Sequence, residues 1–275
     1  MTILLTPYLL LIMATLGLWF KDKRIAWGLF GLSVIAGLVL QRITWTGLLI
    51  LLISVALGWV TSRKGRCPVI AWSLLLLLAL ASIVHLLPGF NNYLWLDNIH
   101  LSDKALPIRT WVNFDKPAIA FVILAFLQPF AHKLSEWLEA LRSWAIMLPS
   151  ILLMIAIGWG SGFIRPDLTL PFWLPLWALI NLVLVCISEE VVFRGLLQGR
   201  LLTPVLGPKV ALVVASLVFA LPHYPGGPAL VALAFVSGLF YGGAYLLKRR
   251  LEAAILLHFS LNMIHFIFFT YPAAR

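Results

Sequence analysis

The stretch LWALINLVLVCISEEVVFRG, residues 176–195, sets the problem that the fold has to solve. Its first half is a run of apolar residues typical of a membrane helix. Its second half carries Glu189, Glu190 and Arg194 in the same apolar setting. Charged side chains within a membrane span are energetically costly, so they usually turn inward to a partner or a water-filled cavity. The stretch therefore predicts a membrane helix that contributes to a buried polar site.

Apolar runs of this kind recur along the whole chain. Hydrophobic residues make up 62% of the 275 residues, and charged residues only 11%. A helix needs about 20 mainly apolar residues to cross a bilayer, so the chain predicts an all-α, polytopic transmembrane helical bundle of about 8–10 spans. The candidate spans are 2–20, 25–40, 43–60, 69–87, 118–131, 145–164, 172–197, 210–223, 229–247 and 253–270.

The formal net charge of +10 comes from 20 Lys and Arg residues against 10 Asp and Glu residues. The basic residues form no continuous face but cluster between apolar runs, as KDKR at 21–24, RKGR at 63–66 and KRR at 248–250. Such clusters are typical of topology signals and of contacts with anionic lipid head groups. The pattern indicates the lipid bilayer as a partner and argues against a nucleic-acid surface. The distribution of Lys and Arg also favours both chain ends outside the cell.

Two connections differ from simple turns. HKLSEWLEALRSW, residues 132–144, places its apolar side chains on one helical stripe, so we expect a helix that lies in the membrane interface. The 30-residue polar segment 88–117 is expected to be a structured loop, with capping of the outer face or gating of lateral entry as alternatives. The predicted organisation is therefore N-terminal transmembrane helices at 1–131, the interfacial helix, and a C-terminal core at 145–275.

The charged residues of the opening stretch have different positions on a helix. Glu190 and Arg194 stand four residues apart, which allows an ion pair along one face. Glu189 is rotated by about 100° from Glu190, because an α-helix has 3.6 residues per turn. The simplest interpretation is one carboxylate that pairs with the arginine and a second that is available for chemistry.

Two later spans supply further polar groups. FALPH places Phe219 and His223 four residues apart before the helix-breaking YPGGP, and HFSLN places His258 and Asn262 one turn apart. A single histidine in a membrane helix is more often a hydrogen-bonding residue than a catalytic one. Together, however, a carboxylate, two imidazoles and a carboxamide contain the parts of a hydrolytic site. Glu can take a proton from water, and His and Asn can donate hydrogen bonds to an oxyanion.

The segments EEVVFR, FALPH and HFSLN resemble, in this order, the EExxxR, FxxxH and HxxxN motifs of the CPBP family. These proteins are the CAAX-processing and bacteriocin-processing glutamic intramembrane proteases, which include the CAAX prenyl endopeptidase. Three motifs in order on successive apolar segments are a specific signal. The resemblance covers residues 145–270 approximately, and it implies a helical bundle that hydrolyses peptide bonds within the membrane.

The resemblance also implies roles for individual residues. The catalytic residues would be Glu189, His223, His258 and Asn262, and the residues that shape the site would be Glu190, Arg194 and Phe219. In this scheme the glutamate activates water with help from the first histidine, and the second histidine and the asparagine stabilise the tetrahedral oxyanion. No metal and no cofactor are implied.

Three functions are compatible with these residues. The preferred prediction is a metal-independent endopeptidase that acts on a peptide or membrane-anchored protein, in a prokaryotic cytoplasmic membrane. The second is a zinc-dependent membrane protease with Glu189, His223 and His258 as ligands, although the HExxH signature is absent. The third is a transporter or non-enzymatic scaffold with a buried carboxylate relay.

Overall fold

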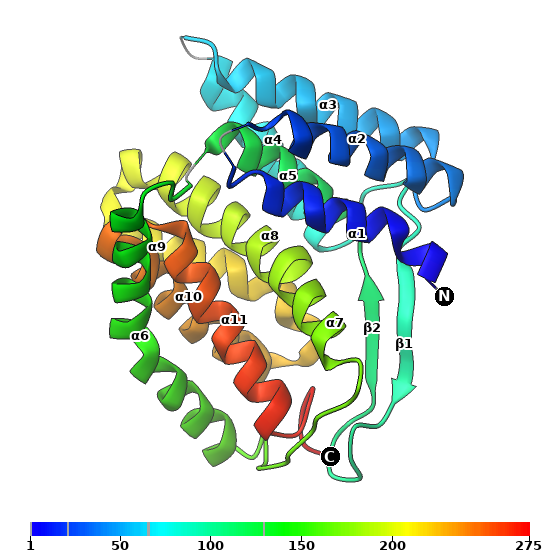
Figure 1. Ribbon diagram of the computed structural model, residues 1–275. Coiled ribbons are helices and arrows are strands. Elements are labelled where there is room, and N and C mark those ends of the chain that lie inside the picture. Colours follow the sequence, from blue (N-terminus) through cyan, green and yellow to red (C-terminus); the bar gives the residue numbers. More distant parts are fainter. Residues whose placement is uncertain (1, 21, 65–66, 129) are drawn as a thin grey trace.

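The computed structural model describes residues 2–20, 22–64, 67–128 and 130–275. The chain is 73% helical with only two short strands among the described residues, which confirms the predicted all-α bundle (Figure 1). Small parts of the predicted regions lie outside the described residues: Met1, Lys21 and residues 65–66 in the basic clusters, and Pro129 in the span 118–131.

Each predicted span overlaps helical structure in the part of the chain that is described. The first part of the chain forms α1 (Thr2–Gly17), α2 (Arg24–Val39), α3 (Trp45–Thr61), α4 (Cys67–Ile83), β1 (Tyr93–Ile99), β2 (Ile108–Val112) and α5 (Asp115–Leu127). The remainder forms α6 (Leu134–Gly160), α7 (Leu174–Ile180), the π-helix η1 (Asn181–Ile187), α8 (Ser188–Glu190), the π-helix η2 (Val191–Leu202), α9 (Thr203–Ala220), the 3-10 helix η3 (Leu221–Gly226), α10 (Pro228–Lys248) and α11 (Leu251–Phe268).

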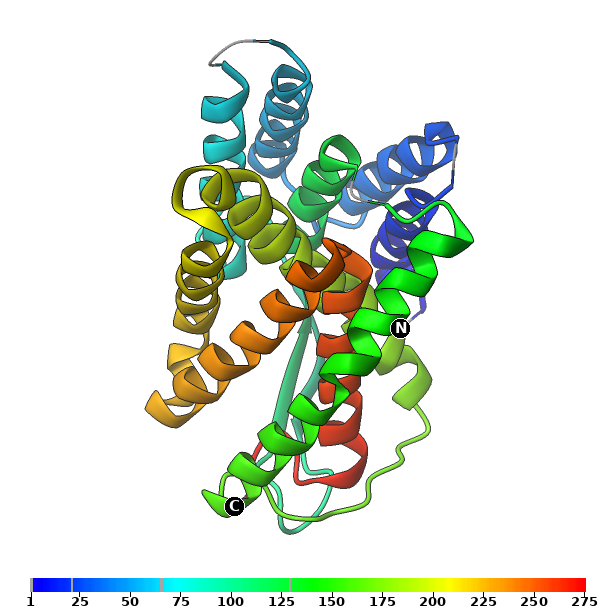
Figure 2. The same cartoon turned by 90° about the vertical axis from the view of Figure 1, so that its left-hand side faces the viewer.

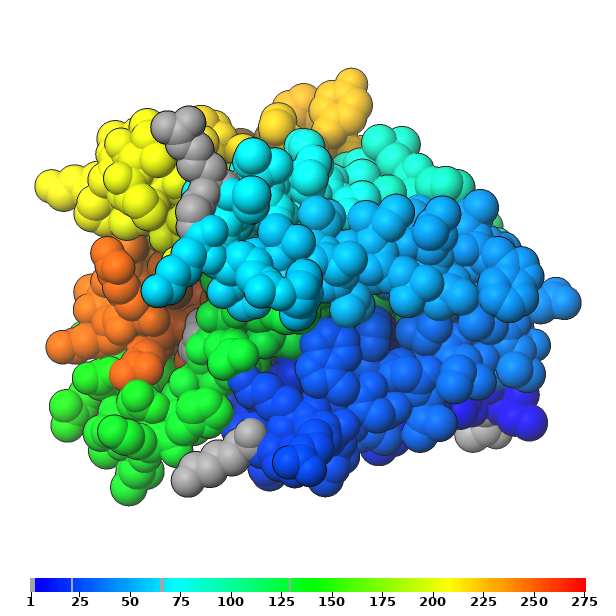
Figure 3. Space-filling view, turned by 90° about the horizontal axis from the view of Figure 1, so that it is seen from above, coloured from blue at the N-terminus to red at the C-terminus, as the bar shows by residue number. Residues whose placement is uncertain are grey.

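The helices have the lengths and surfaces of an integral membrane protein. Within the described residues, four helical segments are long and apolar enough to cross a membrane: α6, the continuous segment Leu174–Gly226, α10 and α11. Helices α2, α3 and α4 form a broad layer in Figure 3. They expose large apolar side chains, among them Leu32, Ile35, Leu49, Leu52, Ile70 and Leu77. Such a surface is suited to lipid and unsuited to water.

Helix α5 is the buried centre of the molecule. Every residue from Asp115 to Ala125 is buried, because α1, α3 and α4 pack against this helix together with η1, α8 and η2. After its first two residues the helix is apolar on all sides, as is typical of a helix buried in a protein interior or a membrane. Helix α5 therefore joins the N-terminal helices to the C-terminal half.

The predicted loop at 88–117 contains a β-hairpin. Strands β1 and β2 pair antiparallel, from Tyr93 opposite Val112 to Ile99 opposite Ile108, with two irregularities in register. The segment, rich in aromatic, Asn and Asp residues, was expected to be a structured loop, and its strands were not predicted. A bridge between Ala105 and Ala274 ties the hairpin to the C-terminal tail. In Figure 1 the hairpin lies on the right of the bundle, whereas the turn between α10 and α11, which carries the basic cluster at 248–250, lies on the left.

The predicted interfacial helix 132–144 and the predicted span 145–164 form one uninterrupted helix, α6. The expected break is missing because the sequence around Trp144 contains no helix breaker, and Pro149 is accommodated within the helix. Leu134, Leu138 and Leu141 are exposed, as expected for an apolar stripe at an interface. Figure 2 shows α6 crossing α11, against which it packs.

Candidate active site

The two glutamates lie in the middle of one long helix. Segments α7, η1, α8 and η2 follow one another without a break from Leu174 to Leu202. The short α-helical piece Ser188–Glu190 is flanked on both sides by wider π-helical turns. Interruptions of this type occur frequently at functional sites. They place both carboxylates where α5 and α11 pack against this helix.

Glu190, Arg194 and His258 form a buried cluster. The predicted ion pair is present, with Arg194 Nη1 donating to Glu190 Oε1 at 3.1 Å and both side chains fully buried. The same Oε1 lies 2.8 Å from His258 Nδ1. The His258 ring also stacks on Tyr241, with 4.6 Å between the ring centroids. Glu190 thus neutralises Arg194 and also orients His258, a contact that the sequence did not predict.

Arg194 is enclosed by α9 and α10. Its Nη2 donates to the Gly238 carbonyl oxygen at 3.1 Å, and its guanidinium carbon lies 4.3 Å from the centre of the Phe219 ring. The Phe219 ring in turn lies 5.1 Å from the His223 ring. Helix α10 can approach this closely because Gly238 and Gly242 have the GxxxG spacing that brings membrane helices together. Phe219 therefore separates the buried guanidinium from His223.

His223 has a defined tautomer. Its Nδ1 lies 3.1 Å from the backbone oxygen of Phe219, one turn earlier. Because a carbonyl oxygen can only accept a hydrogen bond, Nδ1 carries the proton and the neutral ring keeps a lone pair on Nε2. His223 also lines the cavity described below, so this lone pair is available for chemistry there.

The Asn262 carboxamide has partners that the sequence did not predict. Its Nδ2 donates to Asn181 Oδ1 at 3.2 Å and contacts Cys186 Sγ at 3.5 Å. The contact with sulfur is the weaker of the two. Asn181 and Cys186 belong to η1, so this network fixes α11 against the helix that carries the glutamates. Both residues looked like ordinary members of an apolar run in the sequence.

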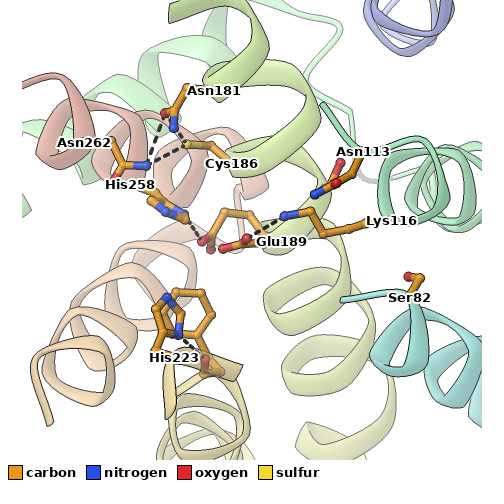
Figure 4. A network of polar contacts seen from close by, with 12 residues as sticks. Ser82, Asn113, Lys116, Asn181, Cys186, Glu189, His223, His258 and Asn262 are labelled. Carbon is orange, nitrogen blue, oxygen red and sulfur yellow. Dashed lines mark hydrogen bonds and ion pairs between the residues drawn. The ribbon is translucent and has the colours of Figure 1, made fainter. Parts of the chain in front are cut away.

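A cavity of about 150 Å³ lies beside these side chains. His223, His258 and Asn262 line it, together with Tyr241 and apolar residues of α6 and α10. The volume suffices for a few water molecules, each of which occupies about 30 Å³ in the liquid. Glu189 does not line this cavity, although Figure 4 shows it between His258 and His223 on one side and Lys116 on the other.

Glu189 forms an ion pair with Lys116, the second residue of α5. Lys116 Nζ donates to Glu189 Oε1 at 2.8 Å, and the two side chains are only 10% and 13% exposed. Sequence reasoning missed Lys116 because it assigned this residue to the polar segment 88–117. The only signal was its position at the edge of an apolar run. The glutamate that was expected to be free therefore has a partner of its own.

Among the residues that the structure describes, no group of three or more His, Cys, Asp and Glu side chains is placed to hold one metal ion. Glu189, His223 and His258 approach one another, but they do not form the ligand set that the zinc interpretation requires.

The sequence also matches a family model. Residues 171–264 match the Type II CAAX prenyl endopeptidase Rce1-like family. These residues form an Rce1-like domain. The domain contains all three motifs and is shorter than the predicted resemblance at 145–270. This match supports, in general terms, a CAAX-type intramembrane protease. It matches no curated protein and no solved structure. Helix α5, with Lys116, lies outside the Rce1-like domain.

Proposed function

We propose that this protein is a glutamic intramembrane endopeptidase in which Glu189 activates a water molecule. The main support is convergence. Glu189 comes from α8, His223 from η3 and His258 from α11; the two histidines line one small cavity, and Glu189 lies between them and Lys116 (Figure 4). A base, a second proton carrier and hydrogen-bond donors around one water-sized space are the requirements for hydrolysis. The proposed substrate is a peptide or a membrane-anchored protein, which is the substrate class that the family match suggests.

In the first step a water molecule attacks the carbonyl carbon of the peptide bond. The new bond forms between the water oxygen and this carbon, and the carbonyl electron pair moves to its oxygen. The water proton passes to the Glu189 carboxylate. In the second step the carbon–nitrogen bond breaks, and the proton moves from Glu189 to the departing amine. The products are a carboxylic acid and an amine, and Glu189 is again ionised.

His223 assists Glu189 in this scheme. The hydrogen bond between its Nδ1 and the Phe219 oxygen leaves the lone pair on Nε2, and the side chain lines the cavity. Nε2 can accept a hydrogen bond from the attacking water and orient the water's lone pair toward the substrate carbon. Positioning of this kind lowers the barrier because the reacting atoms are already close and aligned.

His258 and Asn262 stabilise the oxyanion. With Nδ1 held by Glu190, a His258 ring that carries a proton on Nε2 can donate this N–H to the developing charge. Asn262 contributes one N–H by exchanging its weak contact with Cys186 Sγ for the oxyanion. Its bond to Asn181 keeps the carboxamide in place during this exchange.

The test is the substitution Glu189→Gln. Gln keeps the size of the side chain and can still accept the hydrogen bond from Lys116, but it cannot take a proton from water. We expect a folded protein with a lower unfolding temperature, because Lys116 loses its counter-charge, and a fall in turnover of about 10²–10⁴-fold. Substrates are found by comparing membrane peptides from cells with the native protein and the variant, and turnover is then measured on a peptide so identified.

A matched control is Glu139→Gln, which removes a carboxylate of α6 that pairs with Arg250 away from the site. This variant should leave the peptide profile and the turnover unchanged. Native turnover in Glu189→Gln would remove Glu189 from the mechanism. Assays with a strong chelator complete the test, because activity that is lost in chelator and restored by zinc would favour the zinc-dependent protease.

A further inference from the structure

The ion pair between Lys116 and Glu189 connects two parts of the chain that the family match separates. Lys116 belongs to α5, and the whole of α6 lies between α5 and the Rce1-like domain. Glu189 lies within the matched residues 171–264. The atoms Lys116 Nζ and Glu189 Oε1 are 2.8 Å apart. The N-terminal helices therefore contribute a charged group to the candidate active site.

The charges around the site explain why a lysine is needed there. Glu189 and Glu190 are neighbours in an apolar interior, and Arg194 neutralises only Glu190. A second carboxylate without a cation would leave a net negative charge away from water, which is energetically costly. Lys116 supplies the second positive charge, so the group of four side chains is balanced.

The geometry of the Glu189 carboxylate is also specific. Lys116 holds one oxygen, Oε1, and no other described residue forms a hydrogen bond with Oε2. In Figure 4 the two histidines lie on the opposite side of this carboxylate from the lysine. The lysine thus fixes the orientation of the group and leaves one oxygen for a water molecule.

The lysine itself is held by the hairpin end of the molecule. The backbone N–H of Phe114, two residues earlier, donates to Asn92 Oδ1 at 2.9 Å. Asp115, which is buried, lies 2.9 Å from His85 Nδ1 through its Oδ2. These contacts fix the first turn of α5, so the start of the lysine side chain has little freedom to move.

We propose that Lys116 is a positioning residue for hydrolysis: its ammonium group holds Oε1 of Glu189 so that Oε2 faces the attacking water. This inference rests on the proposed role of Glu189 as the base. It assigns a task in the reaction to the N-terminal helices, which deliver the lysine through α5.

The experiment uses the full chain in lipid nanodiscs and the cleaved peptide found with the Glu189 variant. The variants are Lys116→Arg, Lys116→Gln and Lys116→Met. Arg retains the charge, Gln retains only a neutral N–H donor, and Met retains only the length. We expect Met and Gln to lower kcat by about 10²-fold with little change in KM, because a misplaced base slows the chemical step. Lys116→Arg should recover most of kcat.

Arg250→Met is the matched control, because it breaks an ion pair of 2.9 Å with Glu139 at the turn before α11. It should leave kcat at the native value. Unfolding temperatures are measured for all variants, and Lys116→Gln decides the question if Lys116→Met does not fold.

Native kcat in Lys116→Gln overturns the inference, as does a kcat in Lys116→Arg as low as that in Lys116→Met. A change in KM alone also overturns it. These outcomes are distinct from failure of the proposed function, which would be native turnover in Glu189→Gln.

Discussion

The N-terminal helices and the Rce1-like domain differ in the polar side chains that they bury. In α2 and α3 the buried polar side chains are small, as with Ser33 and Ser54, and each donates its hydroxyl proton to a backbone oxygen. In the Rce1-like domain the buried polar side chains include Glu190, Arg194 and His258, which depend on one another. The first arrangement adds little cost to an apolar bundle. The second contains charges that a bundle would not need for stability alone.

This difference indicates which region contains the functional site. Buried charges are weak evidence for stability, because taking ions out of water can cost more than their attraction returns. Their concentration in one domain therefore indicates a function. Helix α5 is the exception in the N-terminal half, since it buries Asp115 and Lys116 in its first turn. This helix precedes the Rce1-like domain in the sequence, but its residue Lys116 pairs with Glu189 of the candidate active site.

The largest effect that separates the two regions should come from Arg194→Met. The variant leaves the Glu190 carboxylate buried without its cation, and we expect a loss of about 3–5 kcal/mol in the free energy of unfolding. Chemical unfolding in detergent micelles measures this change. The counterpart in the N-terminal helices is Ser54→Ala, which removes only a local hydrogen bond and should cost no more than about 1.5 kcal/mol.

A second variant separates lost charge from lost packing in this experiment. The double substitution Glu190→Gln with Arg194→Met removes both charges, so it should recover part of the stability that Arg194→Met alone loses. Equal losses in Arg194→Met and Ser54→Ala would show that the buried charges carry no more stability than a single hydroxyl. That result would end the contrast between the two regions.

The features that the sequence predicted are those with a local cause. Apolar runs predicted where helices form, because a helix in a bilayer satisfies its own backbone. The spacing of four residues predicted the ion pair of Glu190 and Arg194, which is present. The three motifs predicted the family, and the match at residues 171–264 confirms it. The catalytic roles stay predictions.

The features that the sequence did not predict depend on contacts between distant parts of the chain. Lys116 and Glu189 are 73 residues apart, and Glu190 and His258 are 68 residues apart. Nothing in a single span shows which partner from another helix will face it. The hairpin was missed for a related reason, since its irregular register obscures the alternation that identifies strands.

The next largest change in stability is expected from substitutions of two helix glycines, one in close contact with its neighbours and one in open space. A Cβ at Gly242 in α10 would lie 2.4 Å from Leu212 Cδ1 and 2.6 Å from Gln198 Oε1. We expect Gly242→Val to lower the free energy of unfolding by about 1–3 kcal/mol, because the neighbours must move apart. Gly31 in α2 has no atom within 4 Å of the same position. Gly31→Ala should instead stabilise its helix by roughly 0.5–1 kcal/mol.

Thermal unfolding of the two glycine variants in one detergent gives the comparison directly. The sign of the change is the decisive quantity. A stabilising Gly242→Val would mean that α10 does not pack closely against η2 and α9 in the membrane. It would also mean that a close approach of α10 does not explain the hydrogen bond between Arg194 and the Gly238 oxygen.

The smallest predicted change in stability concerns the β-hairpin, which contacts the start of the Rce1-like domain. The Trp95 ring of β1 meets the Trp173 ring, just before α7, edge to face at 5.6 Å. Trp95→Leu keeps an apolar side chain but loses this contact, which is worth about 0.5–1.5 kcal/mol. Because the contact joins the hairpin to the first helix of the Rce1-like domain, we expect faster amide hydrogen exchange in β1 and β2, with the rest of the bundle unchanged. Trp111→Leu in β2 is the control, since Trp111 is 46% exposed and should affect exchange less. Equal exchange in both variants would show that the hairpin is held by its backbone bridge to the C-terminal tail and not by this aromatic pair.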